Sequence, residues 1–464
     1  MFRISNHHVS SIVFSLLFVE FITLVASVYL GAVIRFHDTN PINSGQLDYF
    51  FLSSCAFAGV MLFSMSTLGM YQISFKEGIR NTLLRLMPSF ALGFAIITFV
   101  FYLVPSLYFG RGILMLVLFI AGCGILLVRI LFFKSSEFKL LESRIIFLGV
   151  GTLAKECSDL ARNNLAYHKY NIVGFIQTSD EDACIPDKDI LPLYDSLMAT
   201  AIKHDAREII VSVQNKRGGA FPIQELLKCK LNGIKVTDAA SFFEREACQI
   251  RLDSLVPSWL VFGGGFDQSF FRVFSKRLFD LFVSLLISLI SLPVMLLTAI
   301  CIYGEDRSPI FYRQERVGKD GHSFMVLKFR SMRKDAEKGM NPQWAQNNDP
   351  RTTRVGRIIR KLRIDELPQI LNVLKGEMSF VGPRPERPFF VEQLCEEVPY
   401  YNERHTIKPG ITGLAQVRYQ YGASVEDSIQ KLQYDLYYVK NNSLFLDILI
   451  MIETLQVVLF GKGV

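Results

Sequence analysis

Long apolar stretches separated by short polar segments dominate the first third of the chain. Four of them run approximately over Ser11–Ile34, Tyr49–Leu68, Leu86–Val104 and Ile113–Phe133. At about 1.5 Å of rise per residue, each is long enough to cross a hydrocarbon core of roughly 30 Å as an α-helix. The first is too long for the apolar core of a secretory signal. The pattern predicts a membrane α-helical bundle of four transmembrane helices within residues 1–139.

Positive charge is unevenly distributed among the loops of this bundle. The loop after the second stretch and the exit from the fourth are richer in Lys and Arg than the loops that hold Arg35 and Arg111. The richer segments contain Lys76, Arg80, Arg85, Arg129, Lys134, Lys139 and Arg144. Because cytoplasmic loops carry an excess of positive charge, both ends of the bundle are expected in the cytoplasm.

One acidic residue, Glu20, lies within the first apolar stretch. A carboxylate at membrane depth marks either a proton or ion site or a polar contact with a neighbouring helix. The other predicted spans are expected to carry no charge near the middle of the membrane, so the pattern does not favour a transporter.

The pattern changes to that of a soluble α/β domain over residues 140–268. Ile145–Leu148 predicts a buried strand, and Gly149–Ala154 predicts a tight turn that opens a helix. Further strands are predicted at Ile172–Ile176, Glu208–Val213 and Ile234–Thr237, with a helix at Ile223–Leu231. Strands that alternate with helices favour a parallel, Rossmann-like sheet. The turn has only two glycines, so it is either a nucleotide site or a packing turn in a regulatory or scaffolding domain.

A fifth apolar stretch, Leu278–Ile302, differs from the first four because positive charges flank both of its ends. Pro293 near its middle lacks an amide donor and disrupts the preceding helical turn. We predict a re-entrant membrane helix over about residues 276–303, with the break stabilised by Ser291 or by buried backbone groups. A kinked helix that crosses the membrane is the alternative.

The last segment, residues 269–464, carries the candidate chemistry. Phe311–Gly318 and Met325–Met332 alternate apolar and basic residues, which predicts strands that place cations on one face. Asp365 and Glu366 form adjacent carboxylates among cations, near the expected start of a helix. Since adjacent carboxylates repel, the pair suggests a bound cation such as Mg²⁺. A solvated helix start with ordinary ion pairs is the alternative for an Asp-Glu dipeptide. The apolar segment Ser443–Phe460 fits either an interfacial helix or a core helix.

Composition agrees with a membrane protein. Of the 464 residues, 50% are hydrophobic and 20% are charged, which excludes a disordered or collagen-like chain. The formal net charge of +7 suits anionic lipids or phosphorylated substrates. The 8 cysteines show no CxxC spacing and indicate neither a disulfide framework nor a zinc site.

Nine motifs in the last 200 or so residues occur in the order seen in the bacterial polyprenyl-phosphate glycosyl-1-phosphate transferases. They are Lys276–Asp280, Pro293, Tyr312–Gly318, Lys328–Met332, Asp365–Gln369, Asn372–Ser379, Val381–Pro385, Lys408–Gly413 and Tyr434–Lys440. The chain resembles the large members of this family, which start exopolysaccharide, capsule or O-antigen units. Those members join a four-helix membrane region and a Rossmann-like domain to a small α/β catalytic domain.

The resemblance implies a transfer of sugar 1-phosphate from a UDP-sugar to polyprenyl (undecaprenyl) phosphate, with release of UMP. It implies that Asp365 is the nucleophile that forms an aspartyl phosphosugar, and that Glu366, with Asp365, holds Mg²⁺. The basic phosphate-binding set that it implies is Lys328, Arg330, Arg360 and Arg384. Pro293 matches the helix break, but Leu292 stands where the family has the serine, so that Ser291 lies one position earlier.

The resemblance also implies a multi-pass protein of the bacterial inner membrane, with its catalytic domain on the cytoplasmic face. The expected partners are the donor, the lipid acceptor and the bilayer, with no nucleic acid; a homodimer through the N-terminal half is compatible with the sequence. A non-enzymatic membrane scaffold or nucleotide sensor is the alternative function. A nucleotide-sugar dehydratase is disfavoured because the middle domain lacks a Tyr-x-x-x-Lys element. No residue set identifies the sugar.

Overall fold

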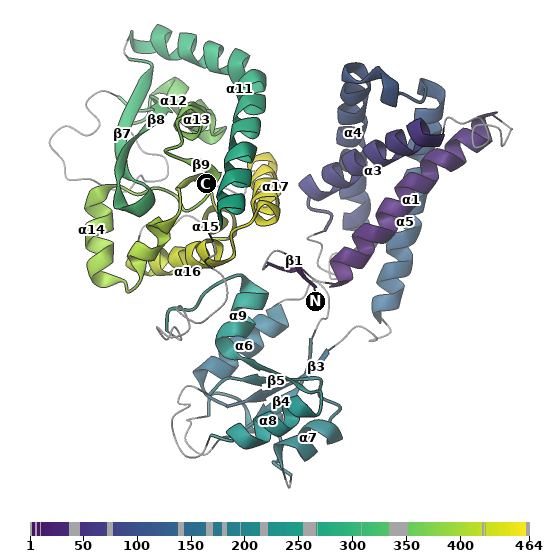
Figure 1. Cartoon of the computed structure of the whole chain (residues 1–464), viewed down its shortest axis with the longest axis vertical. Coiled ribbons are helices and arrows are strands. Elements are labelled where there is room, and N and C mark those ends of the chain that lie inside the picture. The colour runs from purple at the N-terminus through teal and green to yellow at the C-terminus, as the bar shows by residue number, and fades with distance from the viewer. Residues whose placement is uncertain are drawn as a thin grey trace. The chain divides into compact units, whose positions relative to one another are not determined.

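The computed structural model describes residues 2–4, 7–9, 11–36, 47–71, 78–137, 143–163, 170–178, 183–194, 196–213, 221–253, 266, 268–307, 309–333, 351–419, 422 and 424–460. Contacts divide the chain into two compact units, with the division between Ala247 and Cys248 apart from a few N-terminal residues. Figure 1 labels those helices and strands for which there is room. The domain limits at 139/140 and 268/269 remain predictions.

Four helices of the first unit coincide with the predicted apolar stretches. They are α1 (Ser11–Phe36), α3 (Leu47–Thr67), α4 (Gly78–Leu103) and α5 (Arg111–Glu137), with a short turn η2 (Pro105–Leu107) between the last two and the strands β1 (Phe2–Ile4) and β2 (His7–Val9) before the first. Helix α1 packs against α5 and α3, and α3 packs against α4. Each of the four helices is long and apolar enough to cross a membrane. Lys76 and Lys139 lie outside the described residues.

The bundle contains a buried ion pair that the apolar pattern did not predict. Arg129 on α5 donates from Nε to Glu20 Oε1 on α1 at 2.7 Å, and the Tyr71 hydroxyl donates to Glu20 Oε2 at 2.5 Å. The Glu20 side chain is 0% exposed and that of Arg129 is 3% exposed. Arg129, counted from the sequence as a charge at the exit of the fourth stretch, is instead buried beside Glu20. Glu20 makes a polar contact with a neighbouring helix.

A parallel sheet forms the core of the remainder of the first unit. Its strands are β3 (Ser143–Leu148), β4 (Tyr170–Ile176), β5 (Glu208–Val211) and β6 (Lys235–Asp238), in the order β4-β3-β5-β6. The helices are α6 (Thr152–Asn163), α7 (Leu197–Lys203), α8 (Ile223–Leu231) and α9 (Ala239–Ala247), with a turn η3 (Asp187–Asp189). Gly149, at φ 121°, turns the chain from β3 toward α6.

Alternating residues of the strands bury both faces of this sheet. Ile145 and Phe147 of β3 pack in a core shared with α6 and α9, whereas Ile146 and Leu148 pack in a core shared with α7 and α8. Figure 1 shows these two pairs of helices on opposite faces of the sheet. Such two-sided burial explains why the strands read as continuous apolar runs.

The second unit contains a mixed α/β fold. Its elements are α11 (Phe270–Asp306), β7 (Phe311–Val317), η4 (Lys319–Gly321), β8 (Ser323–Phe329), α12 (Arg354–Lys361), η5 (Ile364–Gln369), α13 (Ile370–Lys375), β9 (Ser379–Val381), α14 (Pro388–Glu397), η6 (Tyr401–Thr406), β10 (Gly410–Thr412), α15 (Leu414–Arg418), α16 (Val425–Asn441) and α17 (Leu444–Phe460). Strands β7 and β8 pair antiparallel, and β9 and β10 pair parallel. Leu446 and Ile450 place α17 in the core of this unit.

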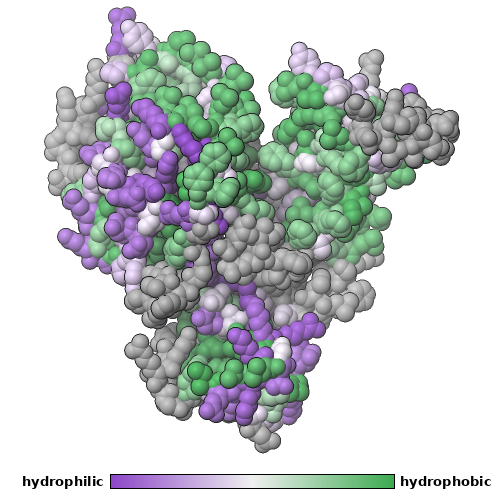
Figure 2. All heavy atoms as spheres, in the orientation of Figure 1, coloured by the Kyte–Doolittle hydropathy of each residue, from purple (hydrophilic) through white to green (hydrophobic). Residues whose placement is uncertain are grey.

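Helix α11 is the fifth helix that is long and apolar enough to cross a membrane. It remains helical through Pro293, and Figure 1 shows it turning sharply from one limb to another. The Ser291 side chain is mostly buried, and its hydroxyl donates to Met295 Sδ at 3.6 Å. Much of the outer surface of α11 is hydrophobic (Figure 2). A proline supplies a physical cause for the bend, because it removes a backbone hydrogen bond.

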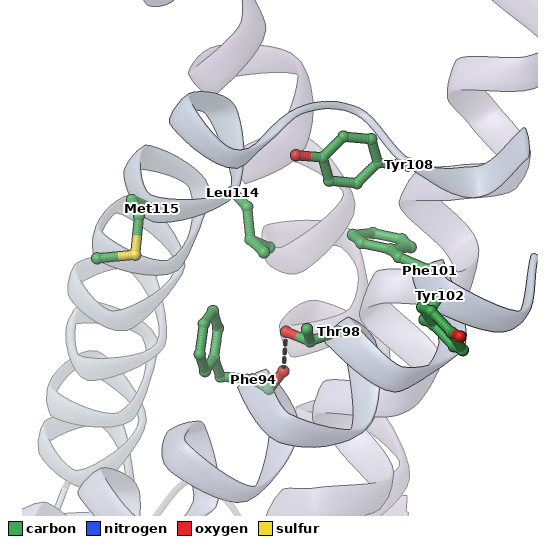
Figure 3. Close-up of a pocket in the computed structure, with 7 residues that line it drawn as sticks. All are labelled: Phe94, Thr98, Phe101, Tyr102, Tyr108, Leu114 and Met115. Carbon is green, nitrogen blue, oxygen red and sulfur yellow. Dashed lines mark hydrogen bonds between the residues drawn. The ribbon is translucent and has the colours of Figure 1, made fainter. Parts of the chain in front are cut away.

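A pocket of about 410 Å³ opens beside α4, η2 and α5 (Figure 3). Its lining is apolar and aromatic, and the Thr98 hydroxyl is already used, since it donates to the Phe94 carbonyl at 2.7 Å. Tyr102 and Met115 on its wall are strongly exposed. The pocket has no charged lining residue and therefore lacks the groups that bind phosphate.

The buried pair predicts the effect of Glu20→Gln. This variant leaves the Arg129 guanidinium buried without a counter-charge, which costs about 3–5 kcal/mol when one partner of a buried pair is removed. We expect a lower unfolding temperature in detergent, measured by differential scanning fluorimetry. The double variant Glu20→Gln/Arg129→Gln removes the stranded charge and should recover part of the loss. Equal unfolding temperatures for wild type and Glu20→Gln would contradict a stabilising pair.

Candidate active site

The two adjacent carboxylates lie in the first turn of η5. Helix α12 ends at Lys361, and Arg363 adopts a left-handed conformation with φ 57° that redirects the chain into η5. A positive φ at a residue other than glycine is uncommon, and it frequently accompanies a functional turn. This turn places Asp365 and Glu366 between α12 and α13.

Close packing at Gly356 holds α12 against the end of β8. A Cβ atom at Gly356 would lie 2.0 Å from the carbonyl oxygen of Ser331, so only glycine permits this approach. The start of α12 is capped twice. The Thr353 hydroxyl accepts from the Gly356 amide at 2.9 Å, and Glu305 at the end of α11 accepts from the Arg354 amide at 2.8 Å. The helix that leads to the carboxylates is therefore anchored to both β8 and α11.

A buried asparagine fixes α13 beside β8. Asn372 accepts from the Leu327 amide at 3.1 Å and donates to the Met325 carbonyl at 2.8 Å. These two bonds reproduce the pairing of a neighbouring strand, and they bring η5 next to Lys328 on β8. Asn372 thus links the sequence motif after the carboxylates to the strand that carries a candidate cation.

Three cations surround the Glu366 carboxylate. Lys328 Nζ lies 3.3 Å from Oε1, Arg384 Nη2 lies 2.9 Å from the same oxygen, and Arg363 Nη1 lies 3.8 Å from Oε2. The Glu366 side chain is 12% exposed. Asp365 differs, because within the described ranges its carboxylate accepts no hydrogen bond and forms no ion pair. One carboxylate is engaged and its neighbour is open.

The two carboxyl groups have opposite pKa shifts. Burial and then the charge of Glu366 raise the pKa of Asp365 to about 6, against the opposing charges of Lys328 and Arg360. Burial would also raise the pKa of Glu366, but the surrounding cations, led by Arg384, outweigh it and lower that pKa. The cations thus favour the anionic form of Glu366, while the raised pKa of Asp365 still lies below neutral pH.

Arg384 reaches the site from the segment after β9. The Gly382 amide donates to the Thr412 carbonyl at 2.9 Å, and the Gly410 amide donates to the Pro383 carbonyl at 2.9 Å. A Cβ at Gly410 would lie 2.1 Å from the Gly382 nitrogen, so the two segments approach as closely as backbone allows. The contact between Gly382 and Gly410 thus fixes the backbone just before Arg384.

The start of α11 docks on the same segment. Lys276 Nζ donates to the Val381 carbonyl at 3.1 Å and pairs with Asp447 of α17 at 2.8 Å. Asp280 accepts from the Ser379 hydroxyl at 3.0 Å and from the Phe380 amide at 3.1 Å. The apolar helix and the strand before Arg384 are therefore one connected structure.

The structure brings together most of the residues selected from the sequence. Lys328, Arg384, Asp365 and Glu366 converge, and Arg360 on α12 acts on Asp365 through its charge. Arg330 is buried directly after β8. Pro293 and Ser291 lie in α11, away from η5 along the chain.

Sequence reasoning omitted two cations that lie beside the site, Arg363 and Arg316. In the β7–β8 register, Arg316 shares a face with Lys328, since Tyr312 pairs with Lys328 and strand residues alternate. Arg316 Nη1 donates to the Pro385 carbonyl at 3.1 Å. Pairing the two predicted strands would have identified Arg316, whereas no sequence signal marks the left-handed turn at Arg363.

The two carboxylates are also candidate ligands for Mg²⁺. Among the residues that the structure describes, no group of three or more His, Cys, Asp or Glu side chains converges. Mg²⁺ commonly takes only one or two protein carboxylates and completes its shell with water and substrate phosphates. The open Asp365 carboxylate beside Glu366 fits that mode. The described residues do not supply enough ligands for a site built wholly from protein.

The chain is similar to bacterial sugar transferases. The family model described as "Bacterial sugar transferase" matches residues 271–461. A UDP-N-acetylgalactosamine-undecaprenyl-phosphate N-acetylgalactosaminephosphotransferase of Aeromonas hydrophila is 42% identical over 238 residues, which cover 51% of this chain and 55% of the relative. A UDP-glucose:undecaprenyl-phosphate glucose-1-phosphate transferase of Xanthomonas campestris is 35% identical over 303 residues, which cover 63% of this chain and 62% of the relative.

A shorter relative is matched almost throughout its length. This protein, "Uncharacterized sugar transferase EpsL" of Bacillus subtilis, is 40% identical over 195 residues, which cover 41% of this chain and 89% of the relative. The chain spans somewhat more than half the length of the two longer relatives. The residues matched by the family model, 271–461, contain the site built around η5.

The contact at Gly356 predicts that Gly356→Ala destabilises the second unit. The new methyl group must displace the backbone at Ser331, and overpacking of this kind costs about 1–3 kcal/mol. We expect a lower unfolding temperature of the full-length protein in detergent. Gly304→Ala is the matched control, since a Cβ there meets nothing within 4 Å and Gly304 also lies in a helix. Equal losses in the two variants would contradict the packing role of Gly356.

Proposed function

This chain belongs to the bacterial sugar transferase family, and we propose that it transfers a sugar 1-phosphate from a UDP-sugar to undecaprenyl phosphate with release of UMP. The observation that carries the proposal is the unequal state of the two carboxylates. Within the described residues the Asp365 carboxylate has no hydrogen bond or ion pair, whereas Glu366 is paired with Lys328 and Arg384. An available nucleophile next to fixed cations suits attack on a phosphoryl group.

In the first step, an Asp365 carboxylate oxygen attacks the β-phosphorus of the UDP-sugar. The bond between that phosphorus and the bridging oxygen breaks, UMP leaves, and an aspartyl phosphosugar remains. In the second step, a phosphate oxygen of undecaprenyl phosphate attacks the same phosphorus. The bond to Asp365 breaks, the carboxylate is restored, and undecaprenyl-diphospho-sugar is formed.

The cations stabilise charge on the phosphoryl oxygens during both steps. Lys328 and Arg384 are pre-positioned by Glu366, so that little reorganisation is needed when phosphate arrives. Arg360 and Arg330 complete the proposed phosphate-binding set. Asp365 and Glu366 would hold Mg²⁺ when it is bound, and the ion would supply further positive charge beside the diphosphate.

The proposed architecture places this site at a membrane surface. We assign four transmembrane helices, a Rossmann-like domain at the parallel sheet, and α11 as a re-entrant helix bent at Pro293. The site then faces the cytoplasm of a bacterial inner membrane, where a lipid phosphate and a water-soluble donor can meet. The apolar outer surface of α11 and its polar docking on β9 support this assignment.

The first test of the function is UMP release by full-length protein in nanodiscs, with Mg²⁺ and undecaprenyl phosphate. The two longer relatives are named for N-acetylgalactosamine and glucose, so the donors are UDP-N-acetylgalactosamine, UDP-glucose and a panel of other UDP-sugars. Lipid-dependent release with one donor is expected and would identify the sugar. No release from folded wild-type protein with any donor would count against the transferase.

Asp365→Asn should abolish the reaction. The amide retains the shape of the side chain but removes the nucleophilic charge, and we expect turnover to fall by about a thousand-fold or more. Asp320→Asn is the matched control, because Asp320 is exposed on η4 of the same unit. Turnover of Asp365→Asn close to that of Asp320→Asn would refute the nucleophile assignment.

Metal removal provides a separate prediction. EDTA should stop UMP release, and added Mg²⁺ should restore it, because without the ion the two carboxylates would repel the negatively charged diphosphate. In Glu366→Gln, the Mg²⁺ concentration for half-maximal rate should rise, since one proposed ligand loses its charge. Full activity in EDTA, or unchanged Mg²⁺ dependence in Glu366→Gln, would remove the metal role.

A further inference from the structure

The segment that carries Arg384 is held mainly through its backbone carbonyl groups. Pro383 and Pro385 lack amide donors, so this segment cannot be fixed by a regular backbone ladder. Other elements supply the donors: Lys276 Nζ and the Tyr438 hydroxyl to Val381, the Gly410 amide to Pro383, Arg316 Nη1 to Pro385, and the Val317 amide to Glu386. The carbonyl of Arg384 itself has a different kind of donor.

That donor is the buried guanidinium of Arg404 on η6. Arg404 Nη2 donates to the Arg384 carbonyl at 2.9 Å, and Nη1 donates to the Tyr401 hydroxyl at 2.7 Å. Asp435 of α16 accepts from Arg404 Nε at 3.1 Å and lies 2.7 Å from Nη2. The two side chains are 6% and 4% exposed. All three nitrogens of the guanidinium are thus directed by fixed partners.

We propose that Arg404, oriented by Asp435, is a positioning residue that sets the reach of Arg384 to Glu366 and so prepares the phosphate site. The inference rests on the proposed function. It follows from a short chain of contacts, because Arg404 binds the backbone of the residue whose own Nη2 lies 2.9 Å from Glu366. Neither Arg404 nor Asp435 is required to touch substrate.

The geometry of Arg404 also excludes an easy replacement. A guanidinium presents donors in a planar fork, and it serves Asp435, Tyr401 and the Arg384 carbonyl in three directions. A lysine has one nitrogen on a flexible stem and cannot serve the three sites in the same way. Small displacements of a phosphate-binding side chain can lower the rate strongly, since catalysis depends on its placement.

The physical part of the inference is tested by hydrogen–deuterium exchange of the full chain in nanodiscs. Arg404→Lys should increase exchange in peptides that cover residues 381–386. Asp435→Asn, which retains an acceptor but removes the charge, is the second variant and should give a smaller increase. Arg245→Lys is the matched control, because Arg245 is equally buried and paired with Glu208 at 2.8 Å in the first unit. Unchanged exchange at 381–386 in both test variants overturns the proposal.

The catalytic part is tested by a double-mutant cycle on UMP release. Arg404→Lys alone should lower turnover by about ten- to a hundred-fold, and Arg245→Lys should not. In an Arg384→Met background, the added effect of Arg404→Lys should nearly vanish, because the side chain that it positions is gone. A general loss of stability would instead lower the rate by the same factor in both backgrounds, and that result overturns the proposal.

The two proposals fail in different ways. If the wild type released no UMP, the proposed function would fail, and the exchange experiment would still decide whether Arg404 holds the Arg384 segment. If the wild type were active but the cycle were additive, the function would stand and the positioning role would be wrong.

Discussion

The neutralisation of Glu366 is the interaction on which the rest of the candidate site depends. Two adjacent carboxylates repel each other, and a buried pair cannot both remain charged without nearby cations. Lys328, Arg384 and Arg363 resolve this conflict on one side only. These cations lower the pKa of Glu366, while burial and the charge of Glu366 raise the pKa of the unpaired Asp365 carboxylate to about 6.

Each of these cations belongs to a different element, so the site forms only when all of these elements are correctly packed. Lys328 comes from β8, Arg384 from the segment after β9, and Arg363 from the turn between α12 and η5. Asn372 joins β8 to α13, and Lys276 joins α11 to the β9 segment. The same contacts hold α11, whose outer surface is largely apolar. Its polar residues Lys276 and Asp280 bind the β9 segment that leads to Arg384.

The sequence predicted the elements whose pattern is local. Apolar length identified α1, α3, α4 and α5, and alternating basic residues identified β7 and β8. The sequence also selected both carboxylates and the cations Lys328 and Arg384, because they stand in short recognisable motifs. The local pattern was enough to predict a residue's place wherever a single helix or strand determines it.

Long-range pairing explains what the sequence did not predict. Arg129 was counted as a loop charge because its partner, Glu20, is far away in sequence. Arg404 also escaped notice, since its role requires a carbonyl in one segment and Asp435 in another. A single sequence contains no signal for such pairs, and only the folded chain reveals that a buried charge has been compensated.

The proposed aspartyl phosphosugar can be sought directly, by stopping the reaction between the two proposed steps. The full-length protein is incubated with UDP-glucose or UDP-N-acetylgalactosamine and no lipid acceptor, quenched in acid, digested with pepsin and analysed by tandem mass spectrometry. We expect a phosphosugar adduct on Asp365, with Glu366 unmodified. Release of UMP without an adduct, or an adduct on another residue, would contradict the assignment of an engaged and an open carboxylate.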